Sequence, residues 1–153
     1  MSELNPVRRE VIVPAEPALA FRVFTDRIGA WWPIAELSVY GGGSSVAFVG
    51  DALVETAPGQ PDAVWGSVTV WEPPTTVAFT WHPGSDPDRA SRVRVTFVAD
   101  GERTRVLLEH SGWAKFAQPA QARAEYDRGW PGVLDGYLTA VTGNETTVAM
   151  LPS

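Results

Sequence analysis

The feature that most constrains the fold of this chain is a long apolar stripe near its C-terminal end. Between positions 118 and 141, large apolar residues recur at spacings of three and four, which places them on one side of a helix with about 3.6 residues per turn. The stripe consists of Tyr126, Trp130, Val133, Leu134, Tyr137, Leu138 and Val141. Pro119 suits a first helical turn and Gly143 suits a C-terminal stop. The pattern therefore predicts one long amphipathic helix over residues 118–141.

Several residues of this helix oppose regular helix formation. Pro131 lacks the amide proton that a helix interior needs, so we expect a kink near Trp130. Gly129, Gly132 and Gly136 each cost roughly 1 kcal/mol relative to alanine. Helical geometry puts these glycines together on a flank away from the aromatic centre of the stripe. We expect that flank to pack closely against a loop or another chain.

Upstream of the helix, the apolar residues change to a period of two, which is typical of strands with one buried face. Strands are predicted at residues 7–13, 44–49, 52–56, 64–71, 76–81, 92–98 and 104–110. A short helix is predicted at 16–24, followed by a helical or irregular piece that carries Trp31 and Trp32. Because short turns join the strands, we expect one antiparallel sheet between Val7 and His110, with the helices on one side.

Length and charge limit the function classes. The 153 residues suffice for one domain, which we expect to span 1–153 with its core at 7–141 and a short flexible C-terminal tail. The net charge is −6, from 12 basic and 18 acidic residues. Phosphate-binding surfaces need clustered Lys and Arg, so nucleic acid and anionic membranes are improbable partners.

The absence of cysteine excludes disulfides, thiolate nucleophiles and cysteine-ligated metals. His82 and His110 are the only histidines and lack metal-ligand spacing, so we predict no metal site and no cofactor. No apolar run approaches the roughly 20 residues of a membrane span, and the N-terminus lacks the apolar core of a signal peptide. We expect a cytoplasmic protein.

Four pieces of the sequence carry a family resemblance when they are taken in order. They are the tryptophan pair at 31–32, GSVTVWEPPTTVAFTW at 66–81, RVRVTFVADGERTRVLLEHSGW at 92–113 and YDRGWPGVLDGYL at 126–138. Together they resemble the activator of heat-shock protein 90 ATPase homologue-like family, within the START/SRPBCC superfamily. The resemblance extends from about residue 7 to residue 141.

This resemblance implies an α+β helix-grip fold, in which a curved antiparallel sheet wraps around a long C-terminal helix. In relatives, a cavity between sheet and helix holds hydrophobic small molecules. The superfamily includes lipid and sterol carriers, polyketide cyclases and chaperone-binding domains. The fold alone therefore leaves the activity open.

Aromatic residues dominate the segments that would border such a cavity, and a pocket of aromatics with a few polar groups is the usual small-molecule site. The side chains predicted to bind a ligand are Trp32, Trp65, Phe79, Trp81, His110, Trp113, Tyr126 and Trp130. For any single tryptophan, an ordinary core position is the alternative explanation.

His110 is the one weak candidate for a catalytic residue. It shares a strand face with Val106 and Leu108, so its imidazole could reach the cavity and hydrogen-bond a ligand or move a proton. The alternative is a core histidine with satisfied hydrogen bonds. His82, beside Pro83, is predicted to be a loop residue.

Three hypotheses follow for the function. The first, which residue composition also supports, is a non-catalytic module that binds a hydrophobic or aromatic small molecule under the C-terminal helix. The second is a cyclase- or hydrolase-type enzyme that uses His110 and a pocket tyrosine. The third is an interaction protein, whose candidate partners are a chaperone or a second copy of the chain.

Overall fold

The computed structural model describes the backbone of residues 4–150 and the side chains of residues 4–143. One strand is followed by two helices, six further strands and a long final helix. The elements are β1 (Val7–Val13), α1 (Pro17–Thr25), α2 (Ile28–Trp31), β2 (Ser45–Val49), β3 (Ala52–Thr56), β4 (Ala63–Glu72), β5 (Thr76–Trp81), η1 (Pro87–Arg89), β6 (Ser91–Asp100), β7 (Arg103–Ser111), η2 (Trp113–Lys115) and α3 (Pro119–Met150).

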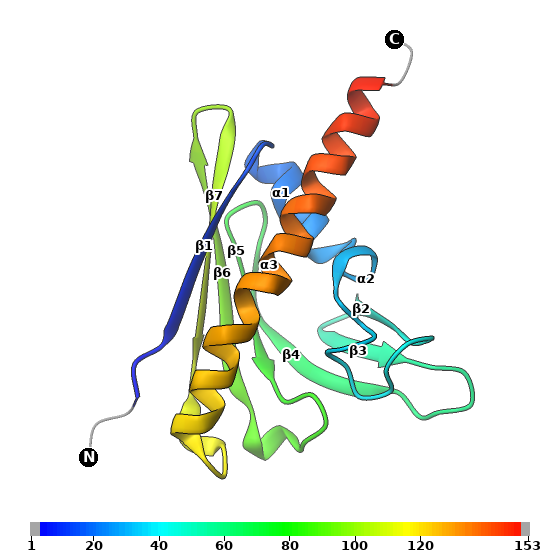
Figure 1. Cartoon of the computed structure of the whole chain (residues 1–153), viewed down its shortest axis with the longest axis vertical. Helices are drawn as coiled ribbons and strands as arrows, with labels where there is room; N and C mark the ends of the chain where they lie inside the picture. The colour runs from blue at the N-terminus through cyan, green and yellow to red at the C-terminus, as the bar shows by residue number, and fades with distance from the viewer. Residues whose placement is uncertain (1–3, 151–153) are drawn as a thin grey trace.

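The strands form one seven-stranded sheet in the order β1-β7-β6-β5-β4-β3-β2, and every neighbouring pair is antiparallel. This confirms the predicted sheet. α3 runs across one face of it, and Figure 1 shows β4, β3 and β2 curving away beside the helix. α1 contacts α3, β6 and β7, whereas α2 contacts α3 and β2. The result is the curved sheet and long C-terminal helix of the helix-grip fold.

The curvature is concentrated in β4. The register shifts between Leu53 and Val54 where β3 pairs with β4, and between Val68 and Val70 where β4 pairs with β5. Such irregularities bend a strand and increase its twist. Gly66 lies between them, and a Cβ atom there would be only 1.7 Å from the carbonyl oxygen of Thr80. Only glycine allows the two backbones to approach this closely.

The core lies between the sheet and α3. The alternation predicted for β6 and β7 is observed: Val93, Val95 and Phe97 point inward with Val106 and Leu108. The buried face of α3 supplies Val133, Leu134, Tyr137 and Val141. The Tyr137 hydroxyl donates a 2.7 Å hydrogen bond to the carbonyl of Ala20, which ties α3 to α1.

The final helix differs from its prediction at its C-terminal end. It remains helical through Pro131 and past Gly143, as far as Met150. The predicted stop at Gly143 is therefore wrong. The backbone of the predicted C-terminal tail is helical as far as residue 150, whether that tail is flexible stays a prediction, and residues 151–153 lie outside the described residues. An interior glycine costs only about 1 kcal/mol, and Gly143 lacks the positive φ that ends a helix.

Gly129, Gly132 and Gly136 of α3 do not act alike. A Cβ atom at Gly136 would lie 3.0 Å from the carbonyl oxygen of Trp31, so the predicted close packing against a neighbouring segment occurs there. Gly129 and Gly132 face open space. Despite its length, α3 is not apolar enough to span a membrane, and neither is any other helix in residues 4–150.

Candidate functional site

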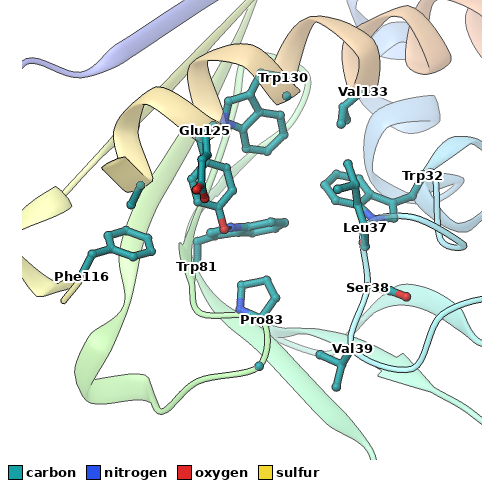
Figure 2. Close-up of a pocket in the computed structure, with 14 residues that line it drawn as sticks. Trp32, Leu37, Ser38, Val39, Trp81, Pro83, Phe116, Glu125, Trp130 and Val133 are labelled. Carbon is teal, nitrogen blue, oxygen red and sulfur yellow. Dashed lines mark hydrogen bonds between the residues drawn. The ribbon is translucent and has the colours of Figure 1, made fainter. Parts of the chain in front are cut away.

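A cleft of about 610 Å³ opens between α3, the segment that follows α2, and the loop that follows β5 (Figure 2). Its walls are mostly apolar. They are formed by Trp32, Leu37, Ser38, Val39, Trp81, Pro83, Gly84, Phe116, Ala122, Glu125, Tyr126, Gly129, Trp130 and Val133. Figure 2 shows Leu37 and Val39 on the opposite side of the cleft from Phe116 and Glu125.

α3 contributes one continuous stripe to this cleft. The stripe consists of Ala122, Glu125, Tyr126, Gly129, Trp130 and Val133, whose spacings of three and four keep them on one side of the helix. It is rotated from the stripe that faces the core, which continues through Leu134, Tyr137 and Val141. Gly129 therefore lines the same surface as the aromatics, and the prediction that it lies on a separate flank is wrong.

Packed indoles form the floor of the cleft. The ring of Trp81 lies 5.6 Å from that of Trp32 and 5.8 Å from that of Trp130, and Trp32 and Trp130 are 6.1 Å apart. Trp65 lies behind them, 5.4 Å from Trp32. Because these rings are almost fully buried, the floor is rigid and apolar.

Two polar groups face this apolar surface. The Trp81 Nε1–H donates a 3.0 Å hydrogen bond to the hydroxyl oxygen of Tyr126. Burial raises the pKa of Tyr126, the bond from Trp81 lowers it by less, and the charge of Glu125 raises it further, so the hydroxyl keeps its proton. Glu125 accepts a 3.1 Å bond from Gln121 and is the one charged side chain among the described residues of the cleft wall.

His110 lies behind the floor, in a chain of hydrogen bonds. The indole N–H of Trp130 can only donate, so it donates to Nδ1 of His110 over 3.1 Å. The ring proton must then be on Nε2, which donates to the Ser91 hydroxyl at 2.7 Å. Ser91 in turn donates to the carbonyl of Trp81 at 3.3 Å. Burial lowers the pKa of His110 to about 3, so the ring is neutral at physiological pH.

The structure separates the predicted ligand-binding residues into two groups. Trp32, Trp81, Tyr126 and Trp130 line the cleft. Trp65, Phe79, His110 and Trp113 do not line it; they are buried among the core residues behind it. The predicted inward strand face of His110 is observed, but their neighbours cover all four of these side chains. His82, predicted to be a loop residue, follows the end of β5 but is buried, with Nδ1 2.9 Å from the carbonyl oxygen of Ser85.

Sequence reasoning missed several residues of the cleft, among them Glu125 and Phe116 as well as one whole side, and one buried charge. Leu37, Ser38 and Val39 come from a segment without any periodicity, so no pattern marked them. Glu55 is fully buried in β3 and bonded to that segment. A signal for Glu55 did exist, because alternation in β3 puts it on the same face as Leu53.

Residues 4–143 hold no group of three or more His, Asp or Glu side chains that could bind a metal ion. The side chains of the cleft offer apolar contact, the Tyr126 hydroxyl as hydrogen-bond donor and the carboxylate of Glu125.

A curved antiparallel sheet, a long C-terminal helix and a cleft between them define the helix-grip class of proteins. A family model described as activator of Hsp90 ATPase homolog 1-like protein matches residues 14–142. The chain belongs to this family, which confirms the resemblance seen in the sequence. No curated protein matches the chain.

Solved structures share the fold over almost the whole chain. Txn09, described as an anthrahydroquino-γ-pyrone synthase complexed with SUM, is 32% identical over 92% of this chain and 99% of its own, with a TM-score of 0.62. CalC, a self-sacrificing resistance protein from Micromonospora echinospora, is 26% identical over 92% and 96%, with a TM-score of 0.61. The Aha1 dimer from Colwellia psychrerythraea, at 20% identity over 90% and 96% and a TM-score of 0.63, shows the fold alone.

Proposed function

We propose that this protein binds a hydrophobic or aromatic small molecule in the cleft beside α3. The observation that carries the proposal is the cleft itself, whose volume of about 610 Å³ is within the usual range for small-molecule sites. Apolar walls with a few fixed polar groups are also the usual composition of such sites.

The polar groups narrow the chemistry of the ligand. Tyr126 accepts a hydrogen bond from Trp81, and this bond polarises its hydroxyl, which becomes a better donor to an oxygen atom of the ligand. A planar aromatic molecule that carries carbonyl or hydroxyl oxygens fits this arrangement. The similarity to Txn09, whose name refers to an aromatic pyrone, supports the same class.

An enzyme is the second candidate, favoured by the description of Txn09 as a synthase. Its proton donor would be Tyr126, because His110 lies outside the cleft lining and both of its ring nitrogens already have partners. For His110 to act as a base, its ring would have to give up the bond from Trp130.

The proposal is tested by filling the cleft from Gly129. A Cβ atom there meets nothing within 4 Å, so Gly129→Leu places a side chain in the cleft without a backbone clash. We expect it to weaken binding of N-phenyl-1-naphthylamine (NPN), a neutral fluorescent probe, by about tenfold or more, because the loss of one buried apolar contact region amounts to roughly 1.5–3 kcal/mol. The measurement is a fluorescence titration with NPN.

Gly132→Leu is the matched control. Gly132 also faces open space on α3 but does not line the cleft. Both variants should raise helix stability by up to about 1 kcal/mol, and only Gly129→Leu should lose NPN. Equal binding by the two variants would contradict the proposed site. Recovery of chemically altered aromatic ligand from the wild-type protein, but not from Tyr126→Phe, would instead favour the enzyme.

A further inference from the structure

A large part of the cleft wall opposite α3 is neither helix nor strand. We name residues 33–44, which connect α2 to β2, the strap. Leu37, Ser38 and Val39 of the strap line the cleft opposite α3 (Figure 2). Leu37 and Val39 are 45% and 42% exposed, so apolar packing holds the strap only weakly.

A single buried carboxylate anchors the strap. Oε1 of Glu55 accepts the backbone N–H of Val39 at 2.8 Å and the indole N–H of Trp65 at 3.1 Å. Oε2 accepts the backbone N–H of Tyr40 at 3.0 Å and the hydroxyl of Ser44 at 2.7 Å. The Ser44 hydroxyl also lies 2.7 Å from the carbonyl of Gly41, but its one proton goes to the stronger acceptor, the carboxylate.

These bonds explain how a charge is tolerated at a fully buried position. Burial opposes ionisation of Glu55, but the bonds from Ser44, Val39, Tyr40 and Trp65 outweigh it and lower its pKa. Three of the four donors belong to the strap, and the fourth belongs to the core behind the cleft floor. The carboxylate thus joins the strap to β3 and to the tryptophan cluster.

Two other side-chain bonds join the strap to neighbouring residues, and neither replaces Glu55. Trp32 Nε1 donates to the carbonyl of Leu37 at 2.7 Å, at the near end of the cleft wall. The Tyr40 hydroxyl donates to the carbonyl of Pro61 at 2.6 Å, on the exposed side of the strap. The amides of Val39 and Tyr40 themselves are bound only through Glu55 among the described residues.

We propose that the strap is a lid on the cleft and that Glu55 is the positioning residue that holds it closed. The inference rests on the proposed binding function. A ligand that enters or leaves past Leu37 and Val39 displaces the strap, and the strap moves only when its two amides leave the carboxylate. Glu55 therefore controls the rate of ligand exchange without touching the ligand.

The first test measures the anchor without any ligand. Glu55→Gln replaces one acceptor oxygen by an NH₂ group, so two of the four donors lose their partner. We expect the Val39 and Tyr40 amides to exchange with deuterium about tenfold faster or more, with unchanged exchange in β6 and β7. Glu36 is an exposed carboxylate on the same strap, so Glu36→Gln is the matched control. It should leave deuterium exchange unchanged both at the two strap amides and in β6 and β7.

The second test measures the lid. In stopped-flow experiments with NPN, Glu55→Gln should increase the dissociation rate by about fivefold or more, since affinity changes appear mostly in dissociation. Ser44→Ala removes one donor while leaving the charge and should give a smaller effect in the same direction. This milder variant keeps the test valid where Glu55→Gln does not fold.

The outcomes separate this inference from the proposed function. A wild-type protein that does not bind NPN would refute the proposed function. Unchanged exchange of the two amides in Glu55→Gln and Ser44→Ala would refute the anchor. Exchange that becomes faster throughout the sheet would show general destabilisation instead of a lid, and an unchanged NPN dissociation rate would refute the lid.

Discussion

The ring of His110 is bound at both nitrogens, by Trp130 on one side and Ser91 on the other. Its tautomer is therefore fixed by its neighbours. A proton on Nδ1 would point at the indole N–H of Trp130, so that two donors would face each other with no acceptor between them. This residue holds the back of α3 to the sheet, because Trp130 belongs to the helix, His110 to β7 and Ser91 to β6. A side chain that resembled a catalytic base in the sequence has a structural role in the fold.

The same residue should make stability depend on pH. The pKa of His110 is about 3 when folded and 6.5 when unfolded, so between these values only the unfolded chain binds the proton. The contribution of neutral His110 to the free energy of unfolding is complete above pH 6.5 and is lost as the pH falls towards 3. At about pH 4.5 we expect a loss of roughly 3 kcal/mol relative to neutral pH, measured by urea unfolding.

His110→Gln is the comparison for this titration. Glutamine offers a donor group and an acceptor group but does not ionise, so the variant should have a smaller pH slope. It should also be less stable at neutral pH, because it does not reproduce the positions of the two ring nitrogens. The carboxylates titrate equally in both proteins, so their contribution to the pH dependence of the unfolding free energy cancels when the two proteins are compared. The same slope in the two proteins would show that His110 is not the group that titrates.

At the scale of elements, β4 is the strand that bends the sheet around α3. Its backbone comes so close to β5 at Gly66 that Ser67 donates its amide to the side-chain oxygen of Thr80, at 2.8 Å. Just past the end of β5, the amide of His82 bonds to the carbonyl of Trp65 at 2.6 Å. These bonds replace the regular ladder where the strand turns.

Gly66→Ala should therefore be among the most damaging small substitutions in the chain. The added Cβ would lie 1.7 Å from one backbone atom and 2.6 Å from another, both of Thr80, so β4 and β5 would have to separate. We expect a loss of about 3 kcal/mol or more in the free energy of unfolding. The measurement is chemical denaturation.

Gly132→Ala provides the control for this substitution. The same change of one methyl group on α3 meets no atom within 4 Å and should stabilise the protein slightly. A Gly66→Ala protein with wild-type stability would show that the approach of β4 to β5 is not tight.

At the scale of the whole molecule, charge should select among ligands. The chain carries a net charge of −6, and the charged side chain of the cleft wall is the carboxylate of Glu125. We expect 8-anilinonaphthalene-1-sulfonate, which is NPN with an added sulfonate, to bind about fivefold more weakly than NPN, corresponding to roughly 1 kcal/mol. Fluorescence titrations with both probes measure the ratio.

Salt and one substitution identify the cause of this preference. The ratio should fall at high ionic strength, where exposed charges are screened, and in Glu125→Gln. A ratio that changes with neither would mean that shape, not charge, discriminates between the two probes.

The fold could be predicted because each strand has one dry face. Alternation of Val93, Val95 and Phe97 with polar residues defines a strand without any tertiary information, and the observed strands begin and end within one or two residues of the predicted ranges. The end of α3 could not be predicted, since a glycine such as Gly143 either ends a helix or is tolerated within it, depending on φ.

The site was predictable only in part, because periodicity reports burial and not what buries a residue. Trp81 and Trp65 follow the same pattern, yet one lines the cleft and the other lies behind it. The strap has no repeat at all, so Leu37 and Val39 could be placed only by the structure. A buried Glu55 needed its partners to be known first, because a carboxylate on an inner face is stable only where donors surround it.

The strand order also determines how the chain folds. Each strand from β2 to β6 pairs with the next one in the sequence, so these contacts form by closing short loops. β1 is different, because its residues 7–13 pair with residues 104–110 and with no other strand of the part of the chain that the structure describes. This pairing cannot form before β7 has been synthesised. It then closes a long loop, which has a high entropic cost and makes the pairing slow. β1 is synthesised before the other strands of this sheet but is among the last to pair, so the nascent chain carries β1 unpaired while β2 to β7 are being made.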